Sequence, residues 1–205
     1  MVYGLYQSAA GILANSHRQD VISNNLANAE TDGFKRQGVS FRQRLTEARS
    51  RGLDPRTHSN ERLEPIGGGL LISPSHIDFS QGDLELTGGA WDVAIQGRGF
   101  FAVRDGGEVR LTRDGRFMVD RNGRLITQNG HLVLDASRRP IVLRTDSPAS
   151  VLADGAISQD GNVVARLGVF DVPDLRRLVR LGGGLFGGAD EPQLRPADAV
   201  LAVGA

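Results

Sequence analysis

The feature that most constrains the fold is a series of turn-forming dipeptides in the second half of the chain. Six Asp-Gly or Asn-Gly pairs lie between residues 105 and 161, and the first four recur at intervals of nine, eight and seven residues. Such pairs adopt the positive φ angles that tight hairpin turns require. The segments between them have the character of short strands, at residues 100–104, 109–113, 117–119, 125–128 and 132–134. The spacing predicts a mainly β fold, an antiparallel meander or sandwich-like domain.

Three further segments continue this β domain, at residues 91–95, 141–143 and 163–172. Because successive side chains of a strand point to opposite faces, the alternation of apolar and polar residues assigns one face to the core. We expect six core residues on this basis: Val93, Ile95, Phe101, Val103, Leu111 and Phe117.

Residues 3–28 have a different period, which indicates one long α-helix. The segment holds no proline, and from Leu5 its apolar residues recur at i, i+1, i+4, i+7 and i+8, with the pattern continuing to Leu26. An Asp-Gly turn signal follows, so we expect a helix of about 25 residues that ends before it, with Asn28 as a cap. Since alanine and serine fill much of the apolar stripe, we expect this helix to pack closely against other helices.

Residues 35–69 are polar and rich in arginine, which is typical of a linker. Phe41, Leu45 and Leu53 could form the apolar side of a short second helix there. The sequence thus predicts four parts: an N-terminal helical segment 1–34, an arginine-rich linker 35–69, a β domain 70–188 and an extended C-terminal segment 189–205.

The composition excludes several classes of function. The 24 basic and 24 acidic side chains balance, which gives no indication of a nucleic-acid partner. The chain contains no cysteine, so disulfides, cysteine-ligated zinc and thiol catalysis are excluded. No apolar run approaches the roughly 18 residues of a membrane-spanning helix, and the first residues lack the pattern of a cleavable signal peptide. We expect a protein that binds no nucleic acid and is not embedded in a membrane.

Motifs of catalytic, cofactor and metal sites are weak. Residues 97–102, G-R-G-F-F-A, fit a dinucleotide fingerprint, but a strand follows instead of the helix that such a site needs. We therefore interpret these glycines as a hairpin or bulge. The four histidines are far apart, and the Asp-Gly pairs do not form a calcium loop. No serine lies in a nucleophile motif. We predict no enzyme activity, no cofactor and no metal.

An asparagine cluster lies in the final turns of the predicted helix, although asparagine is a poor helix former. These residues could be the solvated face of an ordinary helix end. Alternatively, their amides, each with two donors and two acceptor lone pairs, could bridge packed chains. We favour the second interpretation and predict that the helix packs against neighbouring subunits through nine residues: Leu5, Ala9, Ile12, Leu13, Ile22, Asn24, Asn25, Leu26 and Asn28.

Two blocks of the sequence are more specific than these patterns. The first runs from Ser23 to Arg36 as S-N-N-L-A-N-A-E-T-D-G-F-K-R. The second, residues 78–127, includes D-F-S-Q-G-D-L-E-L-T-G, W-D-V-A-I-Q-G-R-G-F-F, R-L-T-R-D-G-R-F and N-G-R-L-I-T. Together and in this order they resemble the signatures of the bacterial flagellar rod, hook and hook-filament junction proteins. Ten residues carry the signature: Gly33, Phe34, Asp92, Gly97, Gly99, Phe100, Phe101, Arg113, Asp114 and Gly115.

The resemblance implies a structural subunit of the flagellar basal-body rod, part of the axial drive shaft, without an enzymatic role. In that family the terminal helices of many subunits pack as a tubular inner layer, with the β domain outside it. The implied partners are other rod and hook–basal-body subunits, copies of the chain itself and the flagellar type III export apparatus. The implied location is the periplasmic span of the rod, reached by export without a cleaved signal peptide.

An alternative from another class is a stand-alone β-sandwich binding module with an N-terminal helical arm, for a carbohydrate for example. Such a module would carry exposed aromatic side chains on one β face. Trp91, Phe100 and Phe101 are the candidates, and all three lie within the family signature, so core packing explains them.

The C-terminus departs from the family pattern. Family members continue with G-x-L-E-x-S-N-V and a long helix, whereas this sequence ends at Val203-Gly204-Ala205, where that block would begin. We expect the C-terminal helix to be absent, through truncation or true loss. The type of rod subunit stays open, because residues 31–36 favour a distal-rod protein and residues 195–200 a proximal-rod protein.

Overall fold

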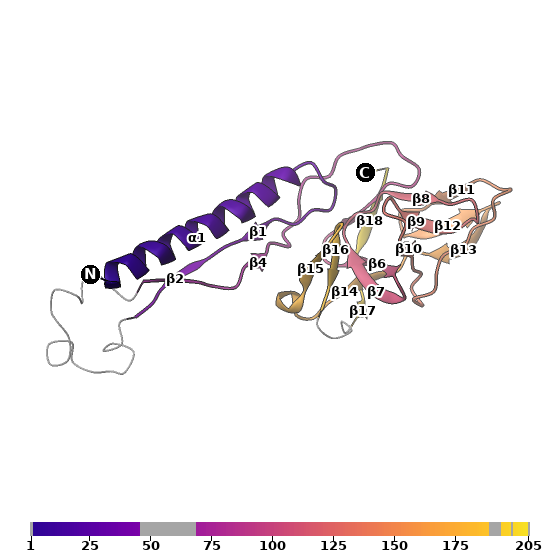
Figure 1. Ribbon diagram of the computed structural model, residues 1–205. Coiled ribbons are helices and arrows are strands. Elements are labelled where there is room, and N and C mark those ends of the chain that lie inside the picture. Colours follow the sequence, from indigo (N-terminus) through magenta and orange to yellow (C-terminus); the bar gives the residue numbers. More distant parts are fainter. Residues whose placement is uncertain (1, 46–68, 189–193, 198, 205) are drawn as a thin grey trace. The chain divides into compact units, whose positions relative to one another are not determined.

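The computed structural model describes residues 2–45, 69–188, 194–197 and 199–204 (Figure 1). The described chain forms two compact units, one within residues 1–30 and 35–78 and the other within residues 31–34 and 79–205. Antiparallel strands and one long N-terminal helix make up most of both units, which confirms the predicted fold class.

The first unit is built on α1, Val2–Ala27. Two short antiparallel ladders accompany the helix (Figure 1). They join β1 (Gln37–Gly38) to β4 (His76–Ile77) and β2 (Phe41–Gln43) to β3 (Leu70–Ile72). α1 contacts β1 and β3. At the predicted helix end, the Asn24 carbonyl oxygen accepts a 3.2 Å hydrogen bond from the Asn28 backbone amide and one of 2.8 Å from Nδ2 of Asn28.

The predicted short helix at Phe41 is wrong. Phe41 lies in β2 because it pairs with Ile72 across the ladder, a partner distant in sequence that local periodicity does not reveal. Leu45 follows this strand and is exposed, and Leu53 lies outside the described residues. Since β3 and β4 belong to the first unit, that unit extends to Asp78 and past the predicted boundary at residue 69.

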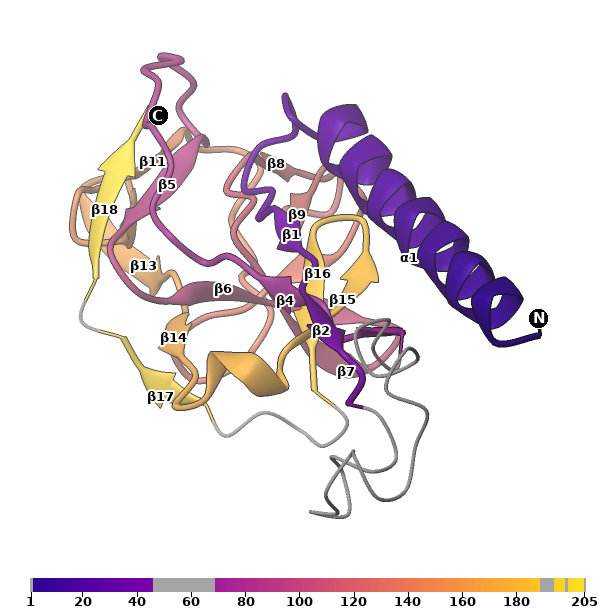
Figure 2. The same ribbon diagram turned by 90° about the vertical axis from the view of Figure 1, so that its left-hand side faces the viewer.

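β6, Phe100–Asp105, is the central strand of the main sheet in the second unit. One edge of β6 pairs with β7, and the other pairs with β14 at its start and with β10 at its end. The sheet runs in the order β15-β16-β7-β6-β10-β9-β8, and Figure 2 shows these strands from a second side. Their bounds are β7 Glu108–Thr112, β8 Phe117–Val119, β9 Leu125–Thr127, β10 Leu132–Val133, β14 Val169–Asp171, β15 Val179–Gly182 and β16 Leu185–Gly187.

Smaller ladders complete the second unit. β11, β12 and β13 form a three-stranded sheet, β5 pairs with β18, and β14 also pairs with β17. A 3₁₀ turn, η2, follows β14 at Leu175–Arg177. The bounds are β5 Val93–Gln96, β11 Ala149–Val151, β12 Ala156–Gln159, β13 Asn162–Arg166, β17 Arg195–Pro196 and β18 Val200–Val203. The described C-terminal strands, β17 and β18, thus pair within the β unit.

The turn dipeptides act as predicted, with one exception. Five of their six glycines have positive φ, at residues 106, 123, 130, 155 and 161. Gly115 does not, and its lack of a side chain serves a close approach instead. A Cβ at Gly115 would collide with the carbonyl oxygen of Val93.

All six predicted core residues are buried. Phe101 and Val103 belong to the main core, whereas Ala102 packs with Leu134 and Phe170 in a second cluster. Because β6 has apolar partners on both faces, its sequence is a continuous hydrophobic run and not an alternating one. β6 is thus the strand around which the β unit is packed.

Substitution of Phe101 or Phe117 by alanine should lower the free energy of unfolding by about 3–5 kcal/mol, the usual cost of deleting a buried phenylalanine ring. The two rings pack edge to face, with centroids 5.0 Å apart. Urea unfolding followed by the fluorescence of Trp91, the only tryptophan, measures this loss. Met118→Ala is the control, since the neighbouring Met118 side chain is exposed and should cost about 0.5 kcal/mol or less. If Met118→Ala lowered the free energy of unfolding as much as the phenylalanine substitutions do, the assigned core would be contradicted.

Candidate assembly interface

One face of α1 packs within its own chain. Ala14 and Val21 are buried on this face, at 2% and 7% exposure. His17 and Asn25 are half-buried three or four residues from these positions, and Gln7 is half-buried seven residues before Ala14, so all three lie along the same side of the helix. The inward face of α1 therefore carries small and polar side chains.

The Asn25 side chain forms hydrogen bonds on this inward face. Its Nδ2 donates a 2.8 Å hydrogen bond to the Gln37 carbonyl oxygen, and its Oδ1 accepts one of 2.9 Å from the Gln37 backbone amide. The amide thus pairs with β1 as a neighbouring strand would. One donor and one acceptor of this amide are therefore used within the chain, and a contact of Asn25 with a neighbouring subunit stays a prediction. Asn24 is exposed, and Asn28 is half-buried and caps the helix.

The opposite face of α1 is exposed and carries several large apolar side chains. Leu5, Ile12 and Leu26 are separated by multiples of seven residues, so they lie along one line of the helix. Ala9 is also exposed. The larger apolar side chains of this outward face retain at least half of their accessible surface: Leu5 71%, Tyr6 71%, Ile12 69%, Leu13 65%, Ile22 52% and Leu26 75%. The residues predicted from the apolar stripe are those that the chain itself leaves uncovered.

Several signature residues come together in the second unit, around the turn after β7. Arg113 lies at its centre, with guanidinium nitrogens donating to the carbonyl oxygens of Ile95 and Gly97 at 3.3 and 2.8 Å. Its Cζ lies 5.2 Å from the centroid of the Phe100 ring. Burial lowers the pKa of the Arg113 guanidinium, although the charge of Asp171 acts in the opposite direction. The side chain thus ties the end of β5 to the start of β6.

Asp114 and Asp92 order the loops beside Arg113. Oδ1 of Asp114 accepts a 3.0 Å hydrogen bond from the Arg116 backbone amide. Burial raises the pKa of the Asp114 carboxyl, and this outweighs that hydrogen bond and the charge of Arg116. Oδ2 of Asp92 accepts a 2.6 Å hydrogen bond from Oγ1 of Thr87. Both signature aspartates therefore have structural contacts within the β unit.

The glycines of the dinucleotide-like motif lie in the bend between β5 and β6. Gly97 and Gly99 have φ angles of 103° and 131°, which favour glycine, and β6 follows them as a strand. A Cβ at Gly99 would also lie 2.9 Å from Cγ1 of Val169. The two glycines therefore let β6 start close to its partner β14.

The aromatic residues that the binding-module alternative needs are turned inward. Phe100 and Phe101 are 1% and 0% exposed, and Trp91 is half-buried against the main core. Phe100 packs edge to face with Phe79 and Phe186. An open cavity of about 290 Å³ beside these rings is lined mainly by apolar surface, with Arg98 and Asp171 at its polar side. The aromatic side chains thus support packing and offer no exposed platform.

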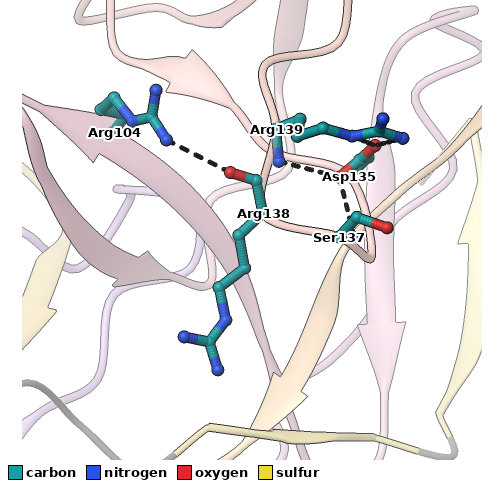
Figure 3. Close-up of polar contacts among 5 residues, drawn as sticks. All are labelled: Arg104, Asp135, Ser137, Arg138 and Arg139. Carbon is teal, nitrogen blue, oxygen red and sulfur yellow. Dashed lines mark hydrogen bonds and ion pairs between the residues drawn. The ribbon is translucent and has the colours of Figure 1, made fainter.

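A polar turn at residues 135–139 was not among the sites predicted from the sequence (Figure 3). Oδ1 of Asp135 accepts hydrogen bonds of 2.8 Å from the backbone amides of Ser137 and Arg139, and Oδ2 pairs with the Arg139 guanidinium at 3.1 Å. The side chain of Arg138 points away from this carboxylate (Figure 3). Arg138 has a φ of 61°, and its carbonyl oxygen accepts a 3.2 Å bond from Arg104. These bonds stabilise the strained backbone conformation of Arg138, which gives the turn a structural role.

The described residues contain no group of three metal-ligating side chains. Among the described helices, none has the length and apolar character needed to cross a membrane.

The fold and this surface define a class of protein in which a helix with an outward apolar face is joined to an antiparallel β unit. Residues 94–165 match the family model "Flagellar hook protein FlgE/F/G D1 domain", and residues 5–35 match "Flagella basal body rod protein". The first match covers most of the second unit, and the second covers α1 and the signature that follows it.

Individual relatives agree with these matches. The chain is 32% identical to the flagellar basal-body rod protein FlgF of Mesorhizobium japonicum, over 87% of this chain and 68% of that protein. It is 31% identical to FlgF of Rhizobium meliloti, over 94% of this chain and 75% of the relative. The flagellar hook protein FlgE of Treponema pallidum is 37% identical over 62% of this chain and 27% of that protein. The chain belongs to the flagellar basal-body rod protein family.

The raised pKa of Asp114 gives a testable pH dependence. A carboxyl group whose pKa is higher in the folded state binds more protons there, so its contribution to stability falls as the pH rises through that pKa. Asp114→Asn removes this titration and keeps an acceptor for the Arg116 amide. The stability of the variant relative to the native chain should therefore increase between about pH 3 and about pH 6, as measured by urea unfolding. A relative stability that falls over this range would contradict the assigned direction.

Proposed function

We propose that this chain is a structural subunit of the flagellar basal-body rod that assembles through the outward face of α1. The exposure of Leu5, Ile12 and Leu26 along one line of the helix is the observation that carries this proposal. An apolar strip of this kind on a folded chain marks an interaction surface, because water contact with it is unfavourable.

The partners of this face are helices of other rod and hook–basal-body subunits, including further copies of the chain. Small residues such as Ala9 on the same face allow helix backbones to approach closely. Asn24 lies near the end of the helix, and its side chain is exposed. Ile12 and Leu13 supply the largest apolar surface near the middle of the face.

The β unit has a supporting role in this proposal. Its signature residues, Arg113 and Gly115 among them, connect strands and loops inside the unit, so they keep its shape. We propose that the chain acts without catalysis, cofactor, metal or nucleic acid. We further propose that it reaches the periplasmic span of the rod through the flagellar type III export apparatus.

Replacing Ile12 with aspartate should abolish rod assembly, because a charge on the outward face cannot be buried between helices without a partner. Complementation of a strain lacking the native subunit, scored by motility and by electron microscopy of basal bodies, measures assembly. The unfolding midpoint of the β unit should stay unchanged, since Ile12 lies in the other unit.

Val142→Asp is the matched control, because Val142 is similarly exposed, at 61%, but lies in the β unit. Strains carrying this control should assemble rods. Normal rods with Ile12→Asp would exclude the outward face of α1 as the assembly surface.

A further inference from the structure

We propose that Gly33 anchors residues 31–34 to the β unit and so fixes the point at which the chain leaves that unit. The segment directly follows α1 and its cap, yet its contacts place it in the second unit. The inference rests on the assembly function proposed above and assigns a positioning role to a segment outside the apolar face of α1.

Gly33 fits against backbone where no side chain has room. Its φ is 67°, in the region that favours glycine. A Cβ on Gly33 would collide with the carbonyl carbon of Arg113 and the amide nitrogen of Asp114. The segment therefore lies directly on the turn that begins with Arg113, and only a glycine permits this distance.

Contacts on both sides of Gly33 hold the segment in place. Before it, a carboxylate oxygen of Asp32 lies 2.5 Å from Nε of Arg116. After it, the ring of Phe34 lies under the guanidinium of Arg180, with Cζ 4.2 Å from the ring centroid. Burial lowers the pKa of Arg180, and a partly desolvated cation interacts more strongly with an aromatic face.

The chain returns to the first unit almost at once. The Arg36 carbonyl oxygen accepts a 2.9 Å hydrogen bond from the Asp78 amide, and the two side chains form an ion pair at 2.7 Å. Both residues belong to the first unit, whereas Phe34 belongs to the second. Only Lys35 separates Phe34 from Arg36 in the chain.

Release of the anchor would free residues 31 to 34 from the second unit, so that the direct connection from Asp78 to Phe79 alone would join the units. With fewer connections the two units can adopt more arrangements, which lowers the effective concentration of one unit for a site set by the other. Assembly that engages α1 in every subunit would lose affinity in this way. The anchor therefore acts on assembly without contacting a neighbouring subunit.

The test compares Gly33→Ala with Gly106→Ala. Both glycines have a positive φ, 67° and 57°, so alanine strains the backbone similarly at each position. Gly106 has open space around it, whereas Gly33 does not. Trypsin cleaves after Lys35 and Arg36, directly beyond the anchor. In native conditions this cleavage should be about tenfold faster in Gly33→Ala than in Gly106→Ala, because local opening exposes the site.

The Trp91 unfolding midpoints of the two variants should agree, and Gly106→Ala should assemble rods while Gly33→Ala should not. Equal cleavage rates in the two variants would overturn the anchor. Faster cleavage of Gly33→Ala with normal rods would overturn its role in positioning. If even the native chain failed to form rods, the proposed function would fall, while the cleavage comparison would still decide whether the anchor exists.

A second pair of variants tests the anchor without backbone strain. Phe34→Leu removes the aromatic face below Arg180 and should raise the cleavage rate about threefold, in line with a modest cation–π contribution. Phe34→Tyr keeps the ring and should cleave at the native rate. Identical rates for the two variants would show that the ring does not hold the segment.

Discussion

The central constraint on this protein is that, among the described residues, one face of α1 is packed and the other is exposed. Ala14 and Val21 are buried on the inward side, and the Asn25 amide is bonded to β1. Leucine and isoleucine side chains on the outward side retain most of their surface. A helix in water gains most of its stability from packing, and α1 is packed within the described chain on its inward side. The apolar face and the family membership therefore point to the same role.

In the β unit, the main constraint is that several backbone segments lie very close together. β6 is buried on both faces, and glycines at its start and at the turn after β7 remove the side chains that would keep its partners apart. Gly33 lies against the backbone of Arg113 and Asp114, and Gly115 lies against the carbonyl oxygen of Val93. The signature glycines thus lie where two backbones approach closely. The charged signature residues Arg113 and Asp114 form hydrogen bonds within the unit.

The sequence predicts most elements because their signals are local. Asp-Gly and Asn-Gly pairs place the turns, alternation identifies core residues such as Phe101 and Leu111, and the 3.6-residue period finds α1. The ladders β1–β4 and β2–β3, the Asn25 bond to Gln37 and the pairing of β18 with β5 depend on segments far apart in sequence. No local pattern reports such a partner, which is why Phe41 is wrongly predicted to be helical and why β17 and β18 are not assigned to the β unit.

Cysteine labelling at neighbouring positions of α1 tests the two-faced helix most directly. The native chain has no cysteine, so Val21→Cys and Ile22→Cys each give a single reactive site. Val21 is 7% exposed and Ile22 is 52% exposed, and their side chains point to different sides of the helix. In the free subunit, a maleimide should label Ile22→Cys much faster than Val21→Cys, and in assembled rods Ile22→Cys should become protected. Labelling of Ile22→Cys at the same rate in rods as in the free subunit would contradict the account.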